Sequence, residues 1–330
     1  MNPDAPTTVL PRCAILDDFQ GVALASADWS PLDGRVEVRA LREHIDPLAD
    51  PDGLVVAVED CEILVVMRER TPLGADLLAR LPRLRLIVTS GMRNASIDLA
   101  AARARGITVC GTASASEPPT ELTWALILGL ARQVHTESAA IRAGGPWQST
   151  VGLDLAGRTL GLVGLGKIGG RVARIGLAFG MDVVAWSPHL DDERAAAHGV
   201  RRAASLTDLL AAADVASLHL VLSDRTRGLI GEAELRAMRP DAYLVNTSRA
   251  GLVDEAALLR ALREGWIAGA GLDVYETEPL PTDDPLRTLP NVLALPHLGY
   301  VTRGNYGRYF GQAVEDVEAW LAGKPVRELG

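Results

Sequence analysis

The chain has 330 residues, of which 48% are hydrophobic and 23% charged, and its formal net charge is −9. This length allows two domains, each with a hydrophobic core of its own. The negative charge argues against a nucleic-acid or anionic-membrane surface, because such surfaces need clustered positive charge.

The cysteines and the first residues bear on the compartment. Cys13, Cys61 and Cys110 stand far apart in apolar runs and lack the spacing of a metal site, which indicates reduced, buried thiols. The first residues lack the basic and apolar regions of a signal peptide, and no apolar segment is long enough to cross a bilayer. We therefore expect a cytoplasmic protein without a bound metal and without a membrane or nucleic-acid partner.

The first third of the chain alternates short apolar runs with amphipathic stretches, a pattern typical of parallel sheets with covering helices. Strands are predicted at 14–16, 36–38, 63–66, 86–88 and 107–109, with helices between them, for example over 74–81 and 97–104. One long helix is then predicted over 120–142, because Pro118 and Pro119 favour a helix start and the Gly-Gly-Pro at 144–146 ends it.

A second series of strands follows, at 159–163, 183–186, 215–218, 243–246, 269–272 and 292–295. Six strands with intervening helices fit a complete dinucleotide-binding sheet. A last helix, at about 305–321, has no strand left to follow it, so we expect it to return to the first domain. The sequence thus predicts an α/β fold with two Rossmann-like domains: a flavodoxin-like, discontinuous substrate-binding domain (1–119 and 299–330) and a dinucleotide-binding domain (120–298), with a cleft between them.

A glycine loop, Gly164-x-Gly166-x-x-Gly169, stands between an apolar strand and an amphipathic helix. In such a loop the first glycine allows a tight turn, the second lets a pyrophosphate approach the backbone, and the third lets the helix pack on the strand. The free N–H groups and the dipole at the helix start attract phosphate. Because strand, loop and helix occur together, this stretch predicts a dinucleotide site.

The next strand ends where a carboxylate for the cofactor ribose usually stands, but here Ser187, Pro188 and His189 follow it. Nothing at Ser187 would repel a 2′-phosphate, yet no arginine stands at this position, and three acidic residues follow at 191–193. We therefore predict a tolerant site that takes NAD or NADP, with Ser187 or His189 contacting the ribose.

Three side chains that suit acid–base chemistry follow successive strands: Arg249, Glu278 and His297. Ligands of open parallel sheets bind at the carboxyl ends of the strands. Arginine suits a carboxylate, and a carboxylate beside histidine favours an imidazolium that can give a proton to a carbonyl oxygen. Each residue alone could be an ordinary surface or core residue, but the three together beside a nucleotide site predict a catalytic set.

Several long stretches, among them "LAGRTLGLVGLGKIGGRVA", "LVNTSRAGLVDEAALLRAL" and "AGAGLDVYETEPLP", resemble the D-isomer-specific 2-hydroxyacid dehydrogenase family, and the likeness covers most of residues 60–304. It implies an NAD(P)-dependent oxidoreductase that transfers hydride between nicotinamide and the carbonyl or hydroxyl carbon of a 2-oxo or D-2-hydroxy acid, such as a glyoxylate or hydroxypyruvate reductase. It also implies a homodimer formed through the dinucleotide-binding domain. The alternative is a non-catalytic, NAD(H)-sensing interaction protein on the same fold.

The resemblance assigns roles to individual positions. It implies that Arg249 binds substrate, that His297 is the acid/base, and that Glu278 is its partner. The cofactor-binding positions that we expect are Gly164, Gly166, Lys167, Ile168, Gly169, Ser187, His189, His219, Thr226, Thr247, Ser248, Asp273 and Gly299. The substrate-binding positions are Arg68, Ser90, Gly91, Met92, Arg93, Arg249 and His297. The loop at 91–95 departs from the family pattern, and Arg93 adds a cation there, so the substrate itself stays open.

Overall fold

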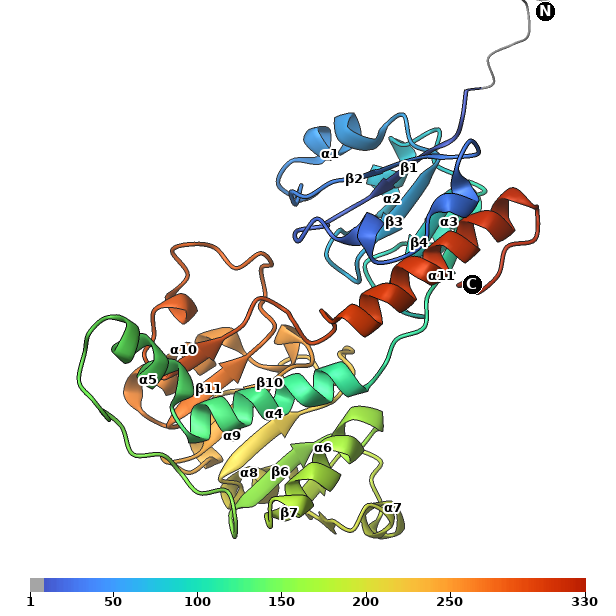
Figure 1. Cartoon of the computed structure of the whole chain (residues 1–330). Coiled ribbons are helices and arrows are strands. Elements are labelled where there is room, and N and C mark those ends of the chain that lie inside the picture. Colours follow the sequence, from blue (N-terminus) through green and yellow to red (C-terminus); the bar gives the residue numbers. More distant parts are fainter. Residues whose placement is uncertain (1–8) are drawn as a thin grey trace, which may run out of the picture. The chain divides into compact units, whose positions relative to one another are not determined.

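The computed structural model describes residues 9–330 (Figure 1). It divides into two compact units. Unit 1 contains the described residues up to Ala115 together with Thr302–Gly330, and unit 2 contains Ser116–Val301. Each unit is built on one parallel sheet covered by helices, so the predicted α/β fold with two parallel sheets is confirmed. The binding roles expected for the two parts of the chain remain predictions.

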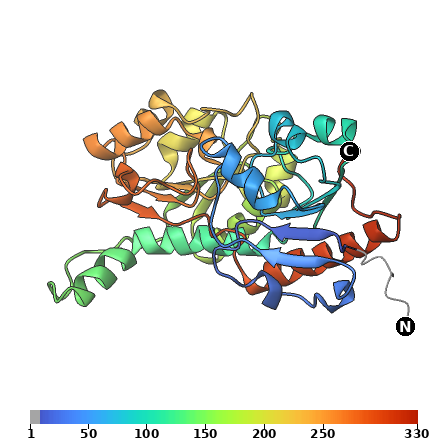
Figure 2. The ribbon, with the colours of Figure 1, turned by 90° about the horizontal axis from the view of Figure 1, so that it is seen from above.

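Unit 1 holds a five-stranded parallel sheet in the order β2-β1-β3-β4-β5. Its strands are β1 (Arg12–Ile15), β2 (Glu37–Ala40), β3 (Ile63–Val66), β4 (Leu86–Thr89) and β5 (Thr108–Gly111). Its helices are η1 (Ala23–Ala25), η2 (Ser30–Leu32), α1 (Pro51–Val58), α2 (Ala75–Ala79), α3 (Leu99–Ala104) and α11 (Arg303–Leu321). Apolar residues of α1, α2 and α3 share one core with alternate strand residues. Helix α11 packs on β4 at the other face (Figure 2).

The segment after α11 extends this sheet at its β5 edge. The N–H of Gly111 donates to the carbonyl of Arg327 at 3.0 Å, and the N–H of Leu329 donates to the carbonyl of Val109 at 2.8 Å. The Arg327 guanidinium also contacts Asp316 of α11 at 2.9 Å. The Asp316 side chain is fully buried, and this burial raises its pKa to about 6 although Arg327 opposes the shift.

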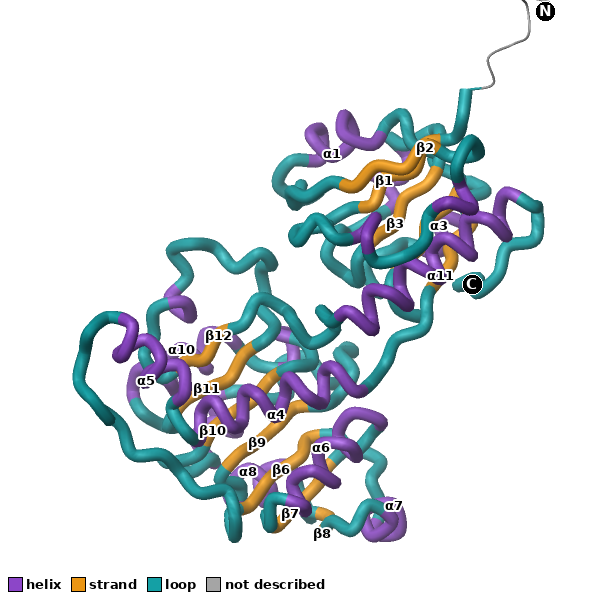
Figure 3. Tube along the Cα trace, viewed as in Figure 1, coloured by secondary structure: helices purple, strands orange, loops and turns teal. Residues whose placement is uncertain are grey.

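Unit 2 holds a seven-stranded parallel sheet in the order β12-β11-β10-β9-β6-β7-β8 (Figure 3). Its strands are β6 (Thr159–Val163), β7 (Asp182–Trp186), β8 (Arg201–Arg202), β9 (Val215–Leu218), β10 (Tyr243–Asn246), β11 (Gly269–Leu272) and β12 (Val292–Ala294). Its helices are α4 (Glu117–Ala131), α5 (Val134–Arg142), α6 (Lys167–Ala178), α7 (Asp192–Ala197), α8 (Leu206–Ala212), α9 (Glu232–Ala237), η3 (Ala250–Leu252), α10 (Glu255–Glu264) and η4 (Pro285–Arg287).

The two faces of this sheet are covered by different helices. Buried side chains of α4, α6 and α7 share one core, and those of α8, α9 and α10 share another. The chain runs from β6 to β7 on one side and returns to β9 on the other. The neighbouring carboxyl ends of β6 and β9 are therefore the point where the strand order reverses, which is where ligands of such sheets bind.

Two expectations about unit 2 were wrong. The predicted single helix over 120–142 is two helices, because Gln133 adopts a left-handed conformation, with φ 51°, between α4 and α5. The short strand β8 was not predicted, since two exposed arginines give no apolar signal.

Candidate active site

The glycine loop lies at the carboxyl end of β6. Gly164 has φ +108°, and a Cβ there would lie 2.6 Å from the carbonyl oxygen of His219. A Cβ on Gly169 would overlap the carbonyl oxygen of Gly164, so helix and turn can approach only without side chains. Gly166, the N-cap of α6, is exposed, and a Cβ there would meet nothing within 4 Å.

Backbone atoms therefore leave no space for a side chain at Gly164 and Gly169, whereas the space beside Gly166, at the start of α6, is open. Lys167 is exposed there and Ile168 is partly buried. Free N–H groups at the start of a 12-residue helix, beside a glycine that leaves space, fit the pyrophosphate of a dinucleotide.

At the carboxyl end of β7 the acidic run is partly neutralised. Ser187 is partly buried and His189 is exposed. The carboxylate of Asp191 caps α7 by accepting the N–H of Arg194 at 2.8 Å, and that of Asp192 contacts the guanidinium of Arg202 at 2.7 Å.

The side chain of Arg194 bends back to this strand end. Its Nη1 donates to the carbonyl of His189 at 3.2 Å, which places a guanidinium beside the expected ribose position. Sequence reasoning missed Arg194 because it stands on the following helix and not at the strand end itself.

Glu278 and His297 form a close polar pair at this edge of the sheet. The His297 Nδ1 and the Glu278 Oε2 lie 2.6 Å apart, and the two side chains are 17% and 23% exposed. The other carboxylate oxygen accepts the N–H of Tyr275 at 3.0 Å, which fixes the carboxylate plane. The imidazole ring also meets the ring of Tyr300 edge-on, with centroids 5.4 Å apart. Because Nδ1 is engaged, Nε2 is the nitrogen that can exchange a proton.

Asp273 fixes the loop that follows His297. It is fully buried, and its two carboxylate oxygens accept the N–H groups of Leu298 and Gly299 at 2.7 and 2.8 Å. Burial raises its pKa to about 6, and the two backbone bonds oppose this shift. The sequence predicted Asp273 and Gly299 as cofactor contacts, and here both belong to one hydrogen-bonded loop beside the His297 backbone.

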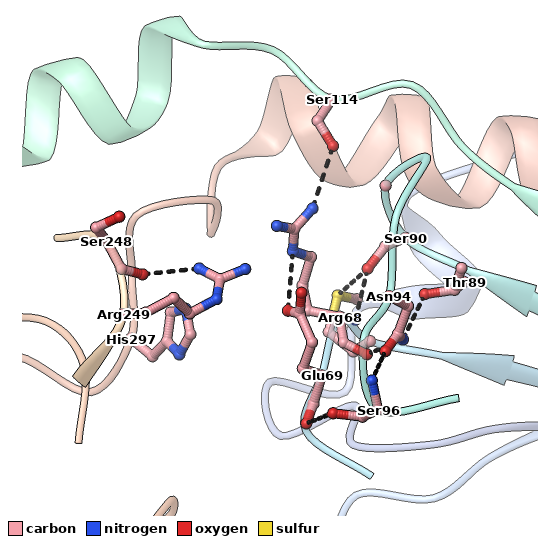
Figure 4. Close-up of polar contacts among 12 residues, drawn as sticks. Arg68, Glu69, Thr89, Ser90, Asn94, Ser96, Ser114, Ser248, Arg249 and His297 are labelled. Carbon is pink, nitrogen blue, oxygen red and sulfur yellow. Dashed lines mark hydrogen bonds and ion pairs between the residues drawn. The ribbon is translucent and has the colours of Figure 1, made fainter. Parts of the chain in front are cut away.

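Arg249 follows β10, and its Nη1 donates to the carbonyl of Ser248 at 2.7 Å (Figure 4). The hydroxyl of Ser248 donates to the carbonyl of Leu220 at 2.6 Å, and that of Thr247 lies 2.8 Å from the hydroxyl of Thr123. Both hydroxyls that were predicted to contact the cofactor therefore brace the turn.

Asn246 was missed by sequence reasoning. It is buried at the end of β10, and its Nδ2 donates to the carbonyl of Arg249 at 3.0 Å while its Oδ1 accepts the N–H of Ser248 at 3.0 Å. It therefore shapes the backbone that carries Arg249. The only signal in the sequence is a polar residue that ends an apolar strand.

Two further predicted cofactor residues follow β9. The Nε2 of His219 lies 2.9 Å from the Ser217 hydroxyl, and burial lowers the pKa of His219 to about 4, so its ring is neutral near pH 7. The hydroxyl of Thr226 donates to the carbonyl of Val221 and accepts the N–H of Ser223, both at 2.8 Å. Thr226 therefore folds its own loop.

In unit 1 the predicted substrate residues surround Arg68, which follows β3. Arg68 has φ +55°, its N–H donates to the Ser90 hydroxyl at 2.9 Å, and its guanidinium contacts Ser114 at 3.5 Å and Glu69 at 3.8 Å (Figure 4). A Cβ on Gly91, whose φ is +97°, would overlap the Arg68 guanidinium. The structure thus brings Arg68, Ser90 and Gly91 together.

In the loop that follows Gly91, Met92 and Arg93 are exposed whereas Asn94 is buried. Met92 is 45% exposed and Arg93 is exposed, so both are accessible in unit 1. Asn94 is buried, and its Nδ2 donates to the carbonyl of Arg68 at 2.5 Å and to the Thr89 hydroxyl at 2.9 Å. Asn94 was not among the predicted site residues, although it holds Arg68 in its left-handed conformation.

Residues 9–330 bear on two other kinds of site, a metal centre and a membrane span. No group of three or more His, Cys, Asp and Glu side chains there is arranged to hold a metal ion. Within the same residues, no helix combines the length and the apolar character needed to cross a membrane.

Comparison with known proteins decides the family. Residues 124–299 match the model of the D-isomer specific 2-hydroxyacid dehydrogenase, NAD binding domain. The chain belongs to the D-isomer-specific 2-hydroxyacid dehydrogenase family. It is therefore an NAD-dependent oxidoreductase that acts on the CH–OH group of 2-hydroxy acids, and the predicted family and reaction class are confirmed.

Named relatives differ in their substrates. The chain is 42% identical over 261 residues to a glyoxylate reductase of Aeropyrum pernix, which covers 76% of this chain and 78% of that protein. It is 39% identical over 304 residues to a D-3-phosphoglycerate dehydrogenase of Mycobacterium tuberculosis, which covers 91% of this chain but only 56% of that one. A solved phosphoglycerate oxidoreductase of Vibrio cholerae is 39% identical, with a TM-score of 0.90 over 95% of this chain and 100% of that one.

Proposed function

We propose that the protein reduces short 2-oxo acids of the glyoxylate or hydroxypyruvate type to the corresponding 2-hydroxy acids. The observation that carries this proposal is the 2.6 Å contact between Glu278 and His297 on the same edge of the sheet as the open glycine turn. The similarity to a glyoxylate reductase favours a small substrate.

In this proposal His297 donates a proton from Nε2 to the carbonyl oxygen of the substrate. Glu278 holds the ring by Nδ1, sets its tautomer and stabilises the charged form. Arg249 binds the carboxylate and the developing alkoxide, for which a guanidinium offers two parallel donors. When it is bound, reduced nicotinamide supplies hydride to the carbonyl carbon.

Unit 1 contributes recognition of the substrate carboxylate. Positive φ at Gly91 and the support from Thr112, whose hydroxyl accepts the Gly91 N–H at 3.1 Å, fix the turn that precedes Met92 and Arg93. We assign to this turn, together with Arg68, the binding of the acid group. Exposed Arg93 gives the loop a cation that favours acidic substrates.

We also propose that the cofactor site accepts both NAD and NADP. No carboxylate follows β7 directly, and the carboxylates of Asp191 and Asp192 are occupied by the α7 N-terminus and by Arg202. The guanidinium of Arg194 near His189 offers a 2′-phosphate a partner. Ser187 remains available to the ribose of either cofactor.

A homodimer formed through unit 2, in a cytoplasmic setting, completes the proposal. Helix α5 has no buried residue, and Val134, Ile141, Trp147 and Val151 on and after it are 55%, 59%, 78% and 98% exposed. Large apolar side chains that are exposed along one stretch of the chain favour burial against a second copy. The three cysteines are free and buried, which suits a reducing compartment.

The test is oxidation of NADH and NADPH by a panel of glyoxylate, hydroxypyruvate, pyruvate and phenylpyruvate. We expect the highest kcat/KM with glyoxylate or hydroxypyruvate. Turnover only with phenylpyruvate would replace the proposed substrate by a bulky one. Binding of NADH without turnover of any member would instead favour the NAD(H)-sensing alternative.

A further inference from the structure

A cavity of about 450 Å³ lies at the amino edge of the unit 1 sheet, opposite to the edge that carries Arg68 and Gly91. Its charged lining residues are Glu62, Arg83, Arg85 and Arg105. Glu62 directly precedes β3 and Arg85 directly precedes β4, while Arg105 stands just before β5. These three strands are parallel neighbours, so the residues before them meet at one edge.

The core fixes the direction of these arginines. Leu84 and Leu86 are 5% and 0% exposed, and in an extended segment the residues between buried ones point outward. Arg85, which lies between them, is accordingly exposed, and Arg83 is exposed in the turn that precedes Leu84. Gly106 has φ +71°, and a Cβ there would meet nothing within 4 Å, so the turn before β5 leaves the cavity unfilled.

The charges in the cavity are not balanced. Its lining contains three arginines and one glutamate, in a chain whose formal net charge is −9. Within residues 9–330 none of Arg83, Arg85 and Arg105 has a hydrogen bond or an ion pair from its side chain. Other arginines of unit 1 are paired, for example Arg12, which contacts Asp60 at 2.6 Å, and Arg80, which contacts Asp52 at 2.5 Å. What sets Arg83, Arg85 and Arg105 apart is that all three line one cavity. Unpaired cations lining a concavity favour an anionic ligand.

This cavity is distinct from the proposed substrate loop. Arg85 and Ser90 stand at opposite ends of β4, five residues apart, a path of roughly 17 Å along an extended strand. One ligand bound to the cavity arginines therefore does not also reach Gly91.

We propose that the cavity binds a small phosphorylated polyol that is neither substrate nor cofactor. The guanidiniums take the phosphate, for which their planar donor pairs are suited, and the Glu62 carboxylate accepts a hydrogen bond from a hydroxyl group. The volume lies within the range of small-molecule sites, about 300–1,000 Å³.

The experiment is calorimetric titration of the full chain with ribose 5-phosphate in saturating NADH, with ribose as the uncharged control. NADH occupies the glycine turn, so phosphate binding there is excluded. We expect saturable binding of ribose 5-phosphate and none of ribose. The double variant Arg83→Ala, Arg105→Ala should weaken binding at least about tenfold. Arg263→Ala, which removes an exposed, unpaired arginine from α10, should leave it unchanged.

Glu62 provides an independent readout. Glu62→Gln keeps a hydrogen-bond acceptor and removes the only negative charge of the lining, so we expect ribose 5-phosphate to bind several-fold more tightly. All substituted side chains reach the surface, and circular dichroism checks that the variants fold. The proposal is overturned if wild-type protein shows no saturable binding, or if the double variant and Arg263→Ala bind alike.

Discussion

Gly91 leaves the space that the Arg68 guanidinium fills: a Cβ on Gly91 would overlap the Nη1 of Arg68, which instead reaches the hydroxyl of Ser114 at 3.5 Å. Gly91 also has φ +97°, which side chains with a Cβ rarely adopt. The turn that is expected to bind the substrate carboxylate and the side chain of Arg68 are therefore coupled in their geometry.

Gly91→Ala should therefore raise the KM for the 2-oxo acid at least about tenfold, because it both strains the turn and displaces Arg68. The Kd for NADH, measured by fluorescence titration, should not change. Gly74→Ala is the matched control, since Gly74 faces open space with φ −77°. Equal KM values for the two variants would remove the turn from substrate binding.

His297→Ala should lower kcat by roughly two to four orders of magnitude while NADH still binds, because the proton donor is lost. Glu278→Gln should lower kcat less, since the amide can still meet Nδ1 but no longer stabilises the imidazolium. Glu276→Gln, an exposed neighbour, serves as control. Steady-state kinetics decide the matter, and near-wild-type turnover of His297→Ala would exclude the proposed acid.

Arg194→Ala should lower kcat/KM for NADPH at least about fivefold and leave that for NADH unchanged, because only the 2′-phosphate needs the guanidinium. The wild type should prefer neither cofactor by more than about a hundredfold, roughly 2.7 kcal/mol. Arg174→Ala on α6 controls for loss of one surface charge. A larger preference, or equal losses with both cofactors, would contradict the tolerant site.

Trp147→Glu combined with Val151→Glu should convert the protein to monomers in multi-angle light scattering. The two residues are 78% and 98% exposed in the single chain, and charges in a dimer interface are costly. Leu48→Glu, which alters an equally exposed side chain of unit 1, should leave the mass unchanged. A monomeric wild type would refute the proposed dimer.

The raised pKa of Asp316 predicts that the free energy of unfolding depends on pH. Its carboxyl has an ordinary pKa of 3.8 in the unfolded chain and about 6 in the folded protein. Between these values the folded state binds more protons, so the contribution of Asp316 to stability is present at low pH and is lost as pH rises through about 6.

Relative to Asp316→Asn, the wild type should therefore lose on the order of 3 kcal/mol of unfolding free energy between about pH 4 and about pH 7. Urea denaturation of both proteins across this range measures the difference. Parallel pH profiles for the two proteins would show that Asp316 ionises normally.

Most strands and the glycine turn could be predicted from the sequence, because buried parallel strands are short apolar runs and the turn needs glycine at fixed places. The break at Gln133 could not be predicted, because no glycine or proline stands between α4 and α5. Helix α4 ends because the single residue Gln133 adopts a left-handed conformation, and the periodicity of apolar residues does not predict one dihedral angle.

The same limit applies to the site. The positions of Glu278 and His297 follow from the strand ends, but the partners of Ser248 and Thr226 do not. Their hydroxyls donate hydrogen bonds to backbone carbonyls of neighbouring segments. The pattern of side chains in the sequence does not predict the path of the backbone that carries those carbonyls. Asn94 and Asn246 were missed for the same reason, because their side-chain amides also donate to backbone carbonyls, those of Arg68 and Arg249.

The pairing of residues 327–329 with β5 has a consequence for how the protein behaves at high concentration. An open edge strand offers unpaired backbone groups to other chains, and β5 would be such an edge. With Gly111 and Val109 bonded to this segment, that edge is covered from within the same molecule. Chains shortened before Arg327 would expose a strand template and would be prone to aggregate, however intact their catalytic residues.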